Sequence, residues 1–183
     1  EQEYLALYEL EVEDLDALQA VSDEHMRRIE ANEMHRSPPE TIDRDNVRSM
    51  YFAETGPRLG GHDDVPETLF MPFTEPVSEE DDEEFNRWYQ EVHLPEVLDV
   101  PGFSAASRYK ETGMNMTGRP WPVNFPYLAL YELGDGTKEA FDNAMKELRR
   151  RISEGDRMEI SDTLGSDKIT QVYSRITDRI AAT

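Results

Sequence analysis

Two identical heptapeptides set the strongest constraint on the fold of this chain. The sequence YLALYEL occurs at residues 4–10 and again at residues 127–133, which is 123 positions further on. A short apolar run of this kind, followed by polar residues, is typical of a buried strand. Because all seven residues recur, we interpret the chain as containing two copies of one structural unit.

The segments after the two heptapeptides repeat the same order of elements. Residues 14–31 carry apolar side chains at helical spacing, and residues 137–152 do the same. Strand-like runs follow at residues 47–54 and 168–176, where Tyr51 in the first run corresponds to Tyr173 in the second within one position. Each copy therefore predicts a strand, a helix and a second strand.

The middle of the chain adds three elements that have no earlier partner. Residues 68–74 (TLFMPFT) and 103–109 (FSAASRY) are predicted strands. A helix is predicted between them, and Pro95 should end it because proline interrupts the helical hydrogen bonds. From residue 68 the order is strand, helix, strand, strand, helix, strand. This order predicts an α+β fold, a ferredoxin-like βαββαβ unit whose antiparallel sheet carries helices on one face.

The repeat also predicts where the units divide. Residues 1–60 correspond to the second half (β-α-β) of a first unit, and residues 61–183 to a complete second unit. The first half of the first unit would be missing from a longer chain, cleaved and kept as a second polypeptide, or replaced by a neighbouring subunit. We favour a missing or separate piece, because an incomplete sheet exposes edge hydrogen bonds and apolar surface.

Composition narrows the choice of partners. The chain has 40 acidic residues against 19 lysines and arginines, a formal net charge of -21. This field repels nucleic acid and anionic membranes, so we expect neither as a partner. The chain has no cysteine, and no apolar run approaches the roughly 20 residues of a membrane-spanning helix. We expect a cytoplasmic protein.

His93 is the main candidate for chemistry. Phe85, Tyr89 and His93 are spaced four apart and share one helical stripe, with the histidine at its C-terminal end. A helix C-terminus favours the imidazolium, whereas burial favours the neutral ring. A histidine with a pKa near its reference value both accepts and donates protons at neutral pH. The alternative is a structural histidine bonded to a backbone carbonyl near Pro95.

Two predicted strands contribute further candidates. Arg108 and Tyr109 alternate on one strand, so only one of them faces the helices. An inward Arg108 would bind a carboxylate or phenolate, whereas an outward one would be solvated or salt-bridged. Tyr127 and Tyr131 share one face of the next strand, either as core aromatics or as a hydroxyl-lined pocket.

Three more aromatic residues complete the set of candidates, and no metal site is among them. Trp88 is a core residue or a pocket wall, Trp121 is a lid residue or an interface anchor in a long loop, and Tyr51 is a candidate for substrate binding. No histidine pair or carboxylate triad has the spacing of metal ligands, and no phosphate-binding loop occurs. We therefore expect neither a metal nor a cofactor.

One combination of motifs resembles EthD-type proteins. It comprises Phe-Asn-Arg-Trp-Tyr-x-x-x-His-Leu-Pro at residues 85–95, Val-Pro-Gly-Phe at 100–103 and Arg-Tyr at 108–109. The resemblance implies membership of the dimeric α+β barrel superfamily, in which two antiparallel sheets pack face to face. It also implies that His93 points into a ligand pocket. That superfamily includes lyases, isomerases, decarboxylases, polyketide cyclases, cofactor-free monooxygenases and haem enzymes.

Together these features lead to one expected function and two alternatives. We expect a cofactor-independent lyase or isomerase in which His93 moves a proton on a small, apolar, aromatic or polyketide-like molecule while Tyr89 holds an oxygen. The alternatives are a non-catalytic ligand-binding or assembly protein and a cofactor-free monooxygenase. We expect a homo-oligomer, or a second polypeptide that completes the first unit.

Overall fold

The computed structural model describes residues 3–34, 42–61, 65–114, 125–156 and 158–178. The chain divides into two compact units. The first comprises Glu1–Phe52 and Glu111–Val123, and the second comprises Ala53–Lys110 and Asn124–Thr183. No helix in the described segments is long and apolar enough to cross a bilayer.

The second unit has the predicted βαββαβ order. In chain order its elements are β3 (Thr68–Thr74), α2 (Asp82–Trp88), a π-helical turn (Tyr89–His93), α3 (Leu94–Leu98), β4 (Phe103–Glu111), β5 (Tyr127–Leu133), α4 (Lys138–Glu154) and β6 (Ile169–Ser174). The strands lie in the order β4-β5-β3-β6, and each neighbouring pair is antiparallel. This is the strand order of a ferredoxin-like sheet, so the predicted fold class is confirmed.

Two short strands extend the sheet beyond β4. They are β1 (Phe52–Glu54) and β2 (Leu59–Gly60), and both pair with β4. The strand predicted over residues 47–54 is therefore formed only at its end. Gly60 has a φ of +67°, and a Cβ there would lie 2.5 Å from the Ser104 carbonyl oxygen, so this close approach of two backbones requires glycine.

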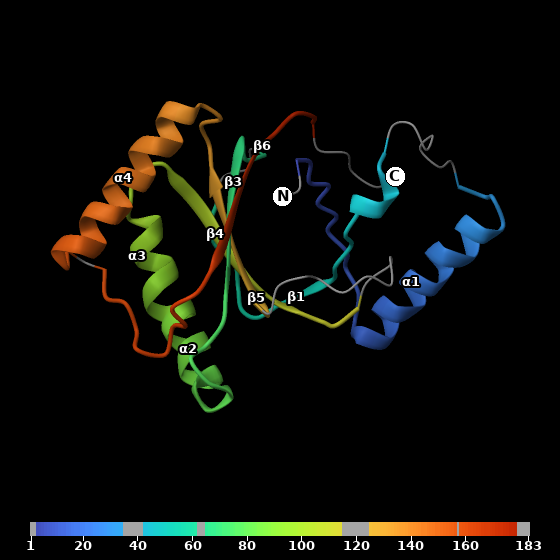
Figure 1. The fold of residues 1–183 in the computed structure, drawn as a ribbon, viewed down its shortest axis with the longest axis horizontal. Coiled ribbons are helices and arrows are strands. Elements are labelled where there is room, and N and C mark those ends of the chain that lie inside the picture. The colour runs from blue at the N-terminus through green and yellow to red at the C-terminus, as the bar shows by residue number, and fades with distance from the viewer. Residues whose placement is uncertain (1–2, 35–41, 62–64, 115–124, 157, 179–183) are drawn as a thin grey trace. The chain divides into compact units, whose positions relative to one another are not determined.

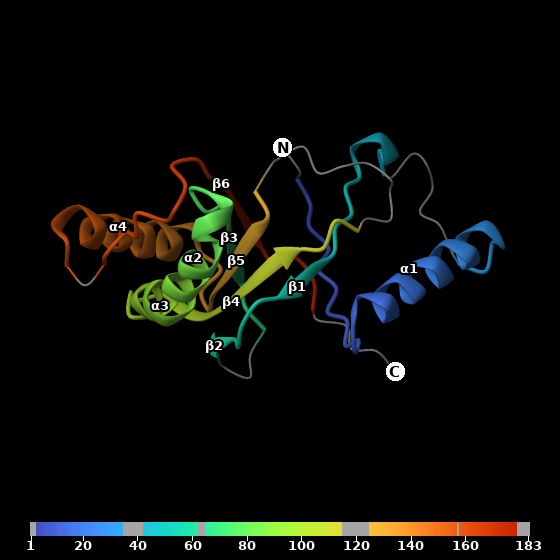
Figure 2. The same ribbon diagram turned by 90° about the horizontal axis from the view of Figure 1, so that it is seen from below.

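The helices of the second unit cover one face of its sheet, as Figures 1 and 2 show for α2, α3 and α4. The sheet contributes alternate residues to the interface, among them Phe70 and Ala129. The helices contribute Phe85, Leu94 and Leu148, and all these side chains are buried. Burial of this apolar surface is the main force that holds the two layers together.

The helix between β3 and β4 does not end at Pro95, so that prediction is wrong. It continues to Leu98 through a π-helical turn, in which the Leu94 amide donates to the Tyr89 carbonyl five residues earlier. Pro95 follows this turn directly, where the regular hydrogen-bond ladder is already interrupted and the missing amide costs little. π-Helical turns occur frequently at functional sites.

The first unit contains the predicted helix but not the predicted first strand. The helix α1 (Leu15–Glu30) begins after Asp14, whose carboxylate accepts a hydrogen bond of 2.8 Å from the Ala17 amide. Residues 4–10 belong to no sheet within the described part of the chain, and their side chains are exposed. A strand requires a partner to complete its hydrogen bonds, and the sequence of the strand alone does not provide one.

Candidate functional site

The core of the second unit encloses an arginine. Arg108 lies on β4, faces the helices and is only 1% exposed. Its cross-strand partner on β5 is Ala129, whose small side chain leaves room for the guanidinium between Tyr127 and Tyr131. The alternation on β4 is thereby resolved, since Arg108 points inward and Tyr109 points to the opposite face of the sheet.

The Arg108 guanidinium contacts aromatic rings instead of an acid. Its Cζ atom lies 3.7 Å from the centroid of the Tyr89 ring, 4.9 Å from that of Phe85 and 5.0 Å from that of Tyr127. None of its three nitrogens has a hydrogen-bond acceptor among the described residues. Burial lowers the pKa of Arg108, yet an arginine stays charged at neutral pH. Arg108 is therefore a buried cation that contacts no carboxylate among the described residues.

Two buried hydroxyls near Tyr89 also have no hydrogen bond among the described residues. They are Thr74 Oγ1, on β3, and the Tyr131 hydroxyl, on β5. Both lie close enough to Tyr89 to affect the pKa of its phenol, which burial raises and Arg108 lowers. Buried polar groups without hydrogen bonds are rare in proteins. Tyr89 is therefore surrounded by Arg108 and by two buried hydroxyls that have no hydrogen bond among the described residues.

His93 lies on the π-helical turn beside the same aromatic residues. Its half-buried imidazole stacks on Trp88, with ring centroids 4.8 Å apart, and meets Tyr89 edge-on at 4.8 Å. Its Nδ1 atom is buried and has no hydrogen-bond partner within the described residues. Burial, followed by the charges of Arg108 and Lys168, lowers the pKa of His93 to about 3. The ring is therefore neutral at pH 7, with Nδ1 available to accept a proton.

The lowered pKa of His93 makes the stability of the protein depend on pH. Between pH 6.5 and pH 3 the unfolded chain binds a proton at this residue and the folded chain does not, so stability falls as the pH drops through this window. We expect the wild type to lose up to about 3 kcal/mol more than His93→Gln between pH 7 and pH 4. Urea unfolding of both proteins at the two pH values measures this. Equal losses would show that His93 titrates normally.

Tyr127 has a structural role that the sequence left open. Its hydroxyl donates a hydrogen bond of 2.6 Å to Asp82 Oδ1 and accepts one of 2.9 Å from Asn86 Nδ2. These bonds attach the first turn of α2 to β5. Tyr131 lies on the same face of β5 four residues further on, and its hydroxyl has no hydrogen bond among the described residues.

The two tyrosines should therefore respond differently to loss of the hydroxyl. We expect Tyr127→Phe to lower the free energy of unfolding by about 1–3 kcal/mol, because it removes one hydrogen bond from Asp82 Oδ1 and one from Asn86 Nδ2. Tyr131→Phe serves as the matched variant, and we expect it to change stability by less than about 0.5 kcal/mol. Urea unfolding measures both values. A larger loss for Tyr131→Phe would mean that its hydroxyl is already bonded in the free protein.

Trp88 packs against His93 in the core of the second unit. It is buried, its Nε1 donates a hydrogen bond of 3.2 Å to the Glu159 carbonyl, and its ring face supports His93. This hydrogen bond fixes the indole, and the indole fixes the imidazole. The contacts favour the core or pocket-wall interpretation of Trp88 over a chemical role.

The structure brings some of the candidate residues together and separates others. Those gathered between the sheet and the helices of the second unit are His93, Tyr89, Trp88, Arg108, Tyr127 and Tyr131. Tyr109 points to the other face of the sheet, Tyr51 belongs to the first unit, and Trp121 lies outside the described residues. Thr74 was not among the predicted candidates. The sequence indicated only that its side chain lies on the inward face of its strand.

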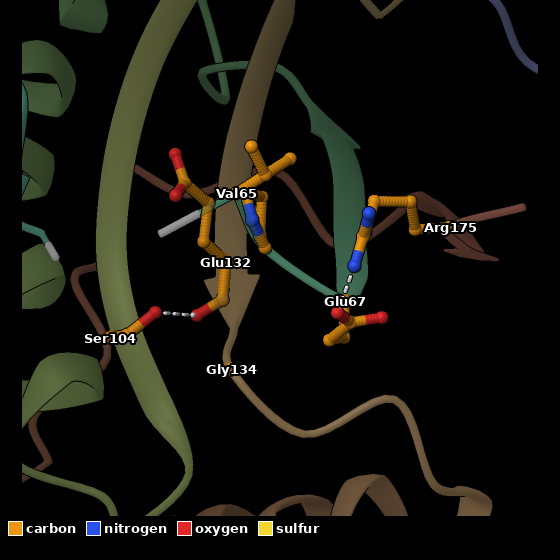
Figure 3. A pocket seen from close by; sticks show the side chains of 7 residues that line it. Val65, Glu67, Ser104, Glu132, Gly134 and Arg175 are labelled. Atoms are coloured by element: carbon orange, nitrogen blue, oxygen red, sulfur yellow. Dashed lines mark hydrogen bonds and ion pairs between the residues drawn. The ribbon is translucent and has the colours of Figure 1, made fainter. Parts of the chain in front are cut away.

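A cavity of about 350 Å³ lies elsewhere in the second unit. Figure 3 shows it beside Ser104, Glu132, Glu67 and Arg175. Glu132 alternates with Tyr131 and therefore points away from the helices. Its carboxylate is held by Arg58 at 2.7 Å, and Glu67 forms an ion pair with Arg175. The charges that line this cavity are already neutralised, so it has no need for a charged ligand.

Comparisons with known proteins place few constraints on this chain. No protein-family model matches it, and no curated protein matches it. Among solved structures, it is similar to HapK from Hahella chejuensis, with 13% sequence identity and a TM-score of 0.39. The match covers 63% of this chain and 99% of HapK. A likeness this distant says nothing about function, and the fold assignment above depends on the strand order alone.

Proposed function

We propose that this protein is a cofactor-independent enzyme that moves a proton on a small aromatic molecule carrying an acidic oxygen. The observation that supports this proposal is the buried guanidinium of Arg108, which has no anionic partner among the described residues. His93 is the proton acceptor in this proposal, and the reaction is of the isomerase or lyase type.

The chemistry of the ligand follows from what the site lacks and what surrounds it. An unpaired buried charge costs several kcal/mol, and a carboxylate, phenolate or enolate oxygen removes that cost when it binds. The hydroxyls of Thr74 and Tyr131 supply two further hydrogen bonds to such oxygens. The walls are the rings of Phe85, Trp88 and Tyr89, which favour an aromatic ligand through stacking.

His93 becomes a better base when the ligand is bound. In the free protein the charge of Arg108 opposes a second positive charge on the imidazole. A bound anion neutralises Arg108, and the pKa of His93 then rises. Its Nδ1 accepts a proton from a carbon adjacent to a carbonyl group of the ligand. The electrons of the broken C–H bond form a C=C bond, and the π electrons of the C=O bond move to the carbonyl oxygen, whose negative charge Arg108 stabilises. If the proton returns to a different carbon, the reaction is an isomerisation. If a neighbouring group leaves instead, the reaction is that of a lyase.

We further propose that the chain is an EthD-type member of the dimeric α+β barrel superfamily. In support, the residues of the motif meet in one place. Phe85, Tyr89 and His93 lie on the helical segment, and Arg108 faces them from the strand that begins at Phe103. On this proposal the face of the sheet opposite the helices packs on a second sheet, either from another copy of the chain or from a completed first unit.

The exchange of a carbon-bound proton tests the proposed activity. Phenylpyruvate is a suitable probe because it has a carboxylate, an aromatic ring and an acidic carbon beside a ketone. In deuterium oxide we expect the protein to accelerate loss of the benzylic proton signal in the NMR spectrum. Binding of the probe without exchange would favour a non-catalytic ligand-binding protein, and oxygen consumption with a phenol would favour a monooxygenase. The absence of both binding and exchange would contradict the proposal.

A further inference from the structure

The two copies of YLALYEL have opposite environments. In β5 all seven residues are buried, whereas in residues 4–10 all seven are exposed. Tyr131 is 1% exposed and its counterpart Tyr8 is 80% exposed. The strand that is buried on both faces in one copy therefore exposes its apolar side chains in the other. Exposed apolar surface of this kind marks a site of interaction.

The structural repeat extends into the helices. The helix α4 begins at Lys138 after the N-cap Thr137, and α1 begins at Leu15 after the N-cap Asp14, so both starts differ by the same 123 positions as the heptapeptides. Each cap side chain accepts a hydrogen bond from the amide three residues later. This agreement is independent of the shared heptapeptide, since the two helices have different sequences.

The second unit shows what covers such a strand. β5 pairs with β4 along one edge and with β3 along the other, and both pairings are antiparallel. The helices α2 and α3, which connect those two strands, cover its inward face. Residues 4–10 therefore lack the counterpart of one continuous strand–helix–strand segment, Thr68 to Glu111.

We propose that residues 4–10 are the acceptor strand of another βαββαβ unit, and that the occupant is a strand–helix–strand segment with the pattern of Thr68 to Glu111, supplied from outside residues 1–183. Two strands of the occupant flank residues 4–10, and its helix covers Tyr4 and Tyr8. A second copy of the chain does not meet this need, because its own segment already covers its own β5. This inference is independent of the proposed function.

The occupant has a predicted chemistry. Tyr4, Ala6 and Tyr8 take the places of Tyr127, Ala129 and Tyr131, so the occupant should have alternating apolar residues that face them. A residue of the occupant lies opposite Ala6, as Arg108 lies opposite Ala129. If that residue is an arginine, the completed unit contains a second anion-binding centre.

The test supplies the occupant from the chain's own sequence. A second copy of residues 65–123 is fused directly before Glu1 of the full chain, which keeps the spacing of the second unit. Hydrogen exchange is followed in peptides that include residues 11–13, because their sequence distinguishes the first heptapeptide from the second. We expect amides of residues 4–10 to exchange at least about a hundredfold more slowly in the fusion than in the unfused chain.

A matched variant separates formation of the strand from a general effect of the fusion. Leu10 is exposed in the unfused chain, whereas its counterpart Leu133 is 1% exposed. We expect Leu10→Asp to remove the protection in the fusion and to leave the exchange of the unfused chain unchanged. Unprotected residues 4–10 in a fusion whose second unit is folded would overturn the inference. Protection in the unfused chain with the mass of a dimer would also overturn it, because a second copy would then be the occupant.

Discussion

Replacement of Arg108 by methionine should make this protein more stable and unable to bind anions. We expect Arg108→Met to raise the free energy of unfolding by about 2 kcal/mol, because it removes an unpaired charge from an aromatic core and fills the space with an apolar chain of similar length. Urea unfolding of both proteins at pH 7 measures the change. Active sites commonly carry this kind of instability, which the ligand relieves.

The sign of this effect depends on two opposing contributions. Cation–π contacts with three rings stabilise the guanidinium, and the shortest of them, with Tyr89 at 3.7 Å, contributes about 0.5–2 kcal/mol. Desolvation of an unpaired ion costs several kcal/mol even after the protein relaxes. The second contribution is larger, so loss of the charge should be favourable overall.

Arg151→Met is the matched control. Arg151 is also largely buried, with a side chain that is 12% exposed, but its guanidinium pairs with Asp99 at 3.0 Å and with Glu147 at 3.0 Å. We expect this substitution to lower stability by up to about 1 kcal/mol, as loss of a partly exposed ion pair does. If Arg108→Met instead lowers stability by more than Arg151→Met, Arg108 is a structural residue and the proposed anion-binding centre is wrong.

His93→Gln should abolish most of the proton exchange and leave binding intact. Loss of a general base typically lowers the rate by about 10²–10⁴-fold, and we expect a decrease in this range for phenylpyruvate exchange followed by NMR. Binding should change little, because the ligand oxygen is held by Arg108 and the hydroxyls around it. Glutamine retains a polar side chain of similar size, so it keeps the contacts with Trp88 and Tyr89.

His25→Gln is the control, because it removes a histidine that lies outside the candidate site. His25 lies on α1 in the first unit and has no place in the proposed chemistry. This variant should exchange the probe at the wild-type rate. If His93→Gln also keeps the wild-type rate, another group removes the proton, and His93 is a structural residue.

The sequence predicted the fold where local pattern was sufficient. The strand order of the second unit and the starts of both long helices followed from hydrophobic periodicity and from the repeat. The end of the helix near Pro95 did not, because a π-helical turn depends on how the helix packs and not on the propensity of its residues. The strand at residues 4–10 is absent from the described sheet for a different reason, since its partners decide whether it forms.

The sequence predicted which residues belong to the candidate site, but it did not predict how their side chains contact one another. Sequence alternation required either Arg108 or Tyr109 to face the helices, and the choice depended on the small Ala129 across the strand. The structural role of Tyr127 depended on Asp82, which is 45 residues away in the sequence and 2.6 Å away in space. Contacts of this kind arise from the tertiary fold, and no spacing rule predicts them.

Ionisation of a bound phenol tests the anion-binding centre most directly. The visible absorption of 4-nitrophenol reports whether its oxygen is protonated, and an unpaired guanidinium stabilises the phenolate. At a pH about one unit below the pKa of the free phenol, we predict that wild-type protein increases the phenolate band and that Arg108→Met does not. An equal increase with both proteins, or no increase with either, would contradict the assignment of Arg108 as the group that binds the ligand oxygen.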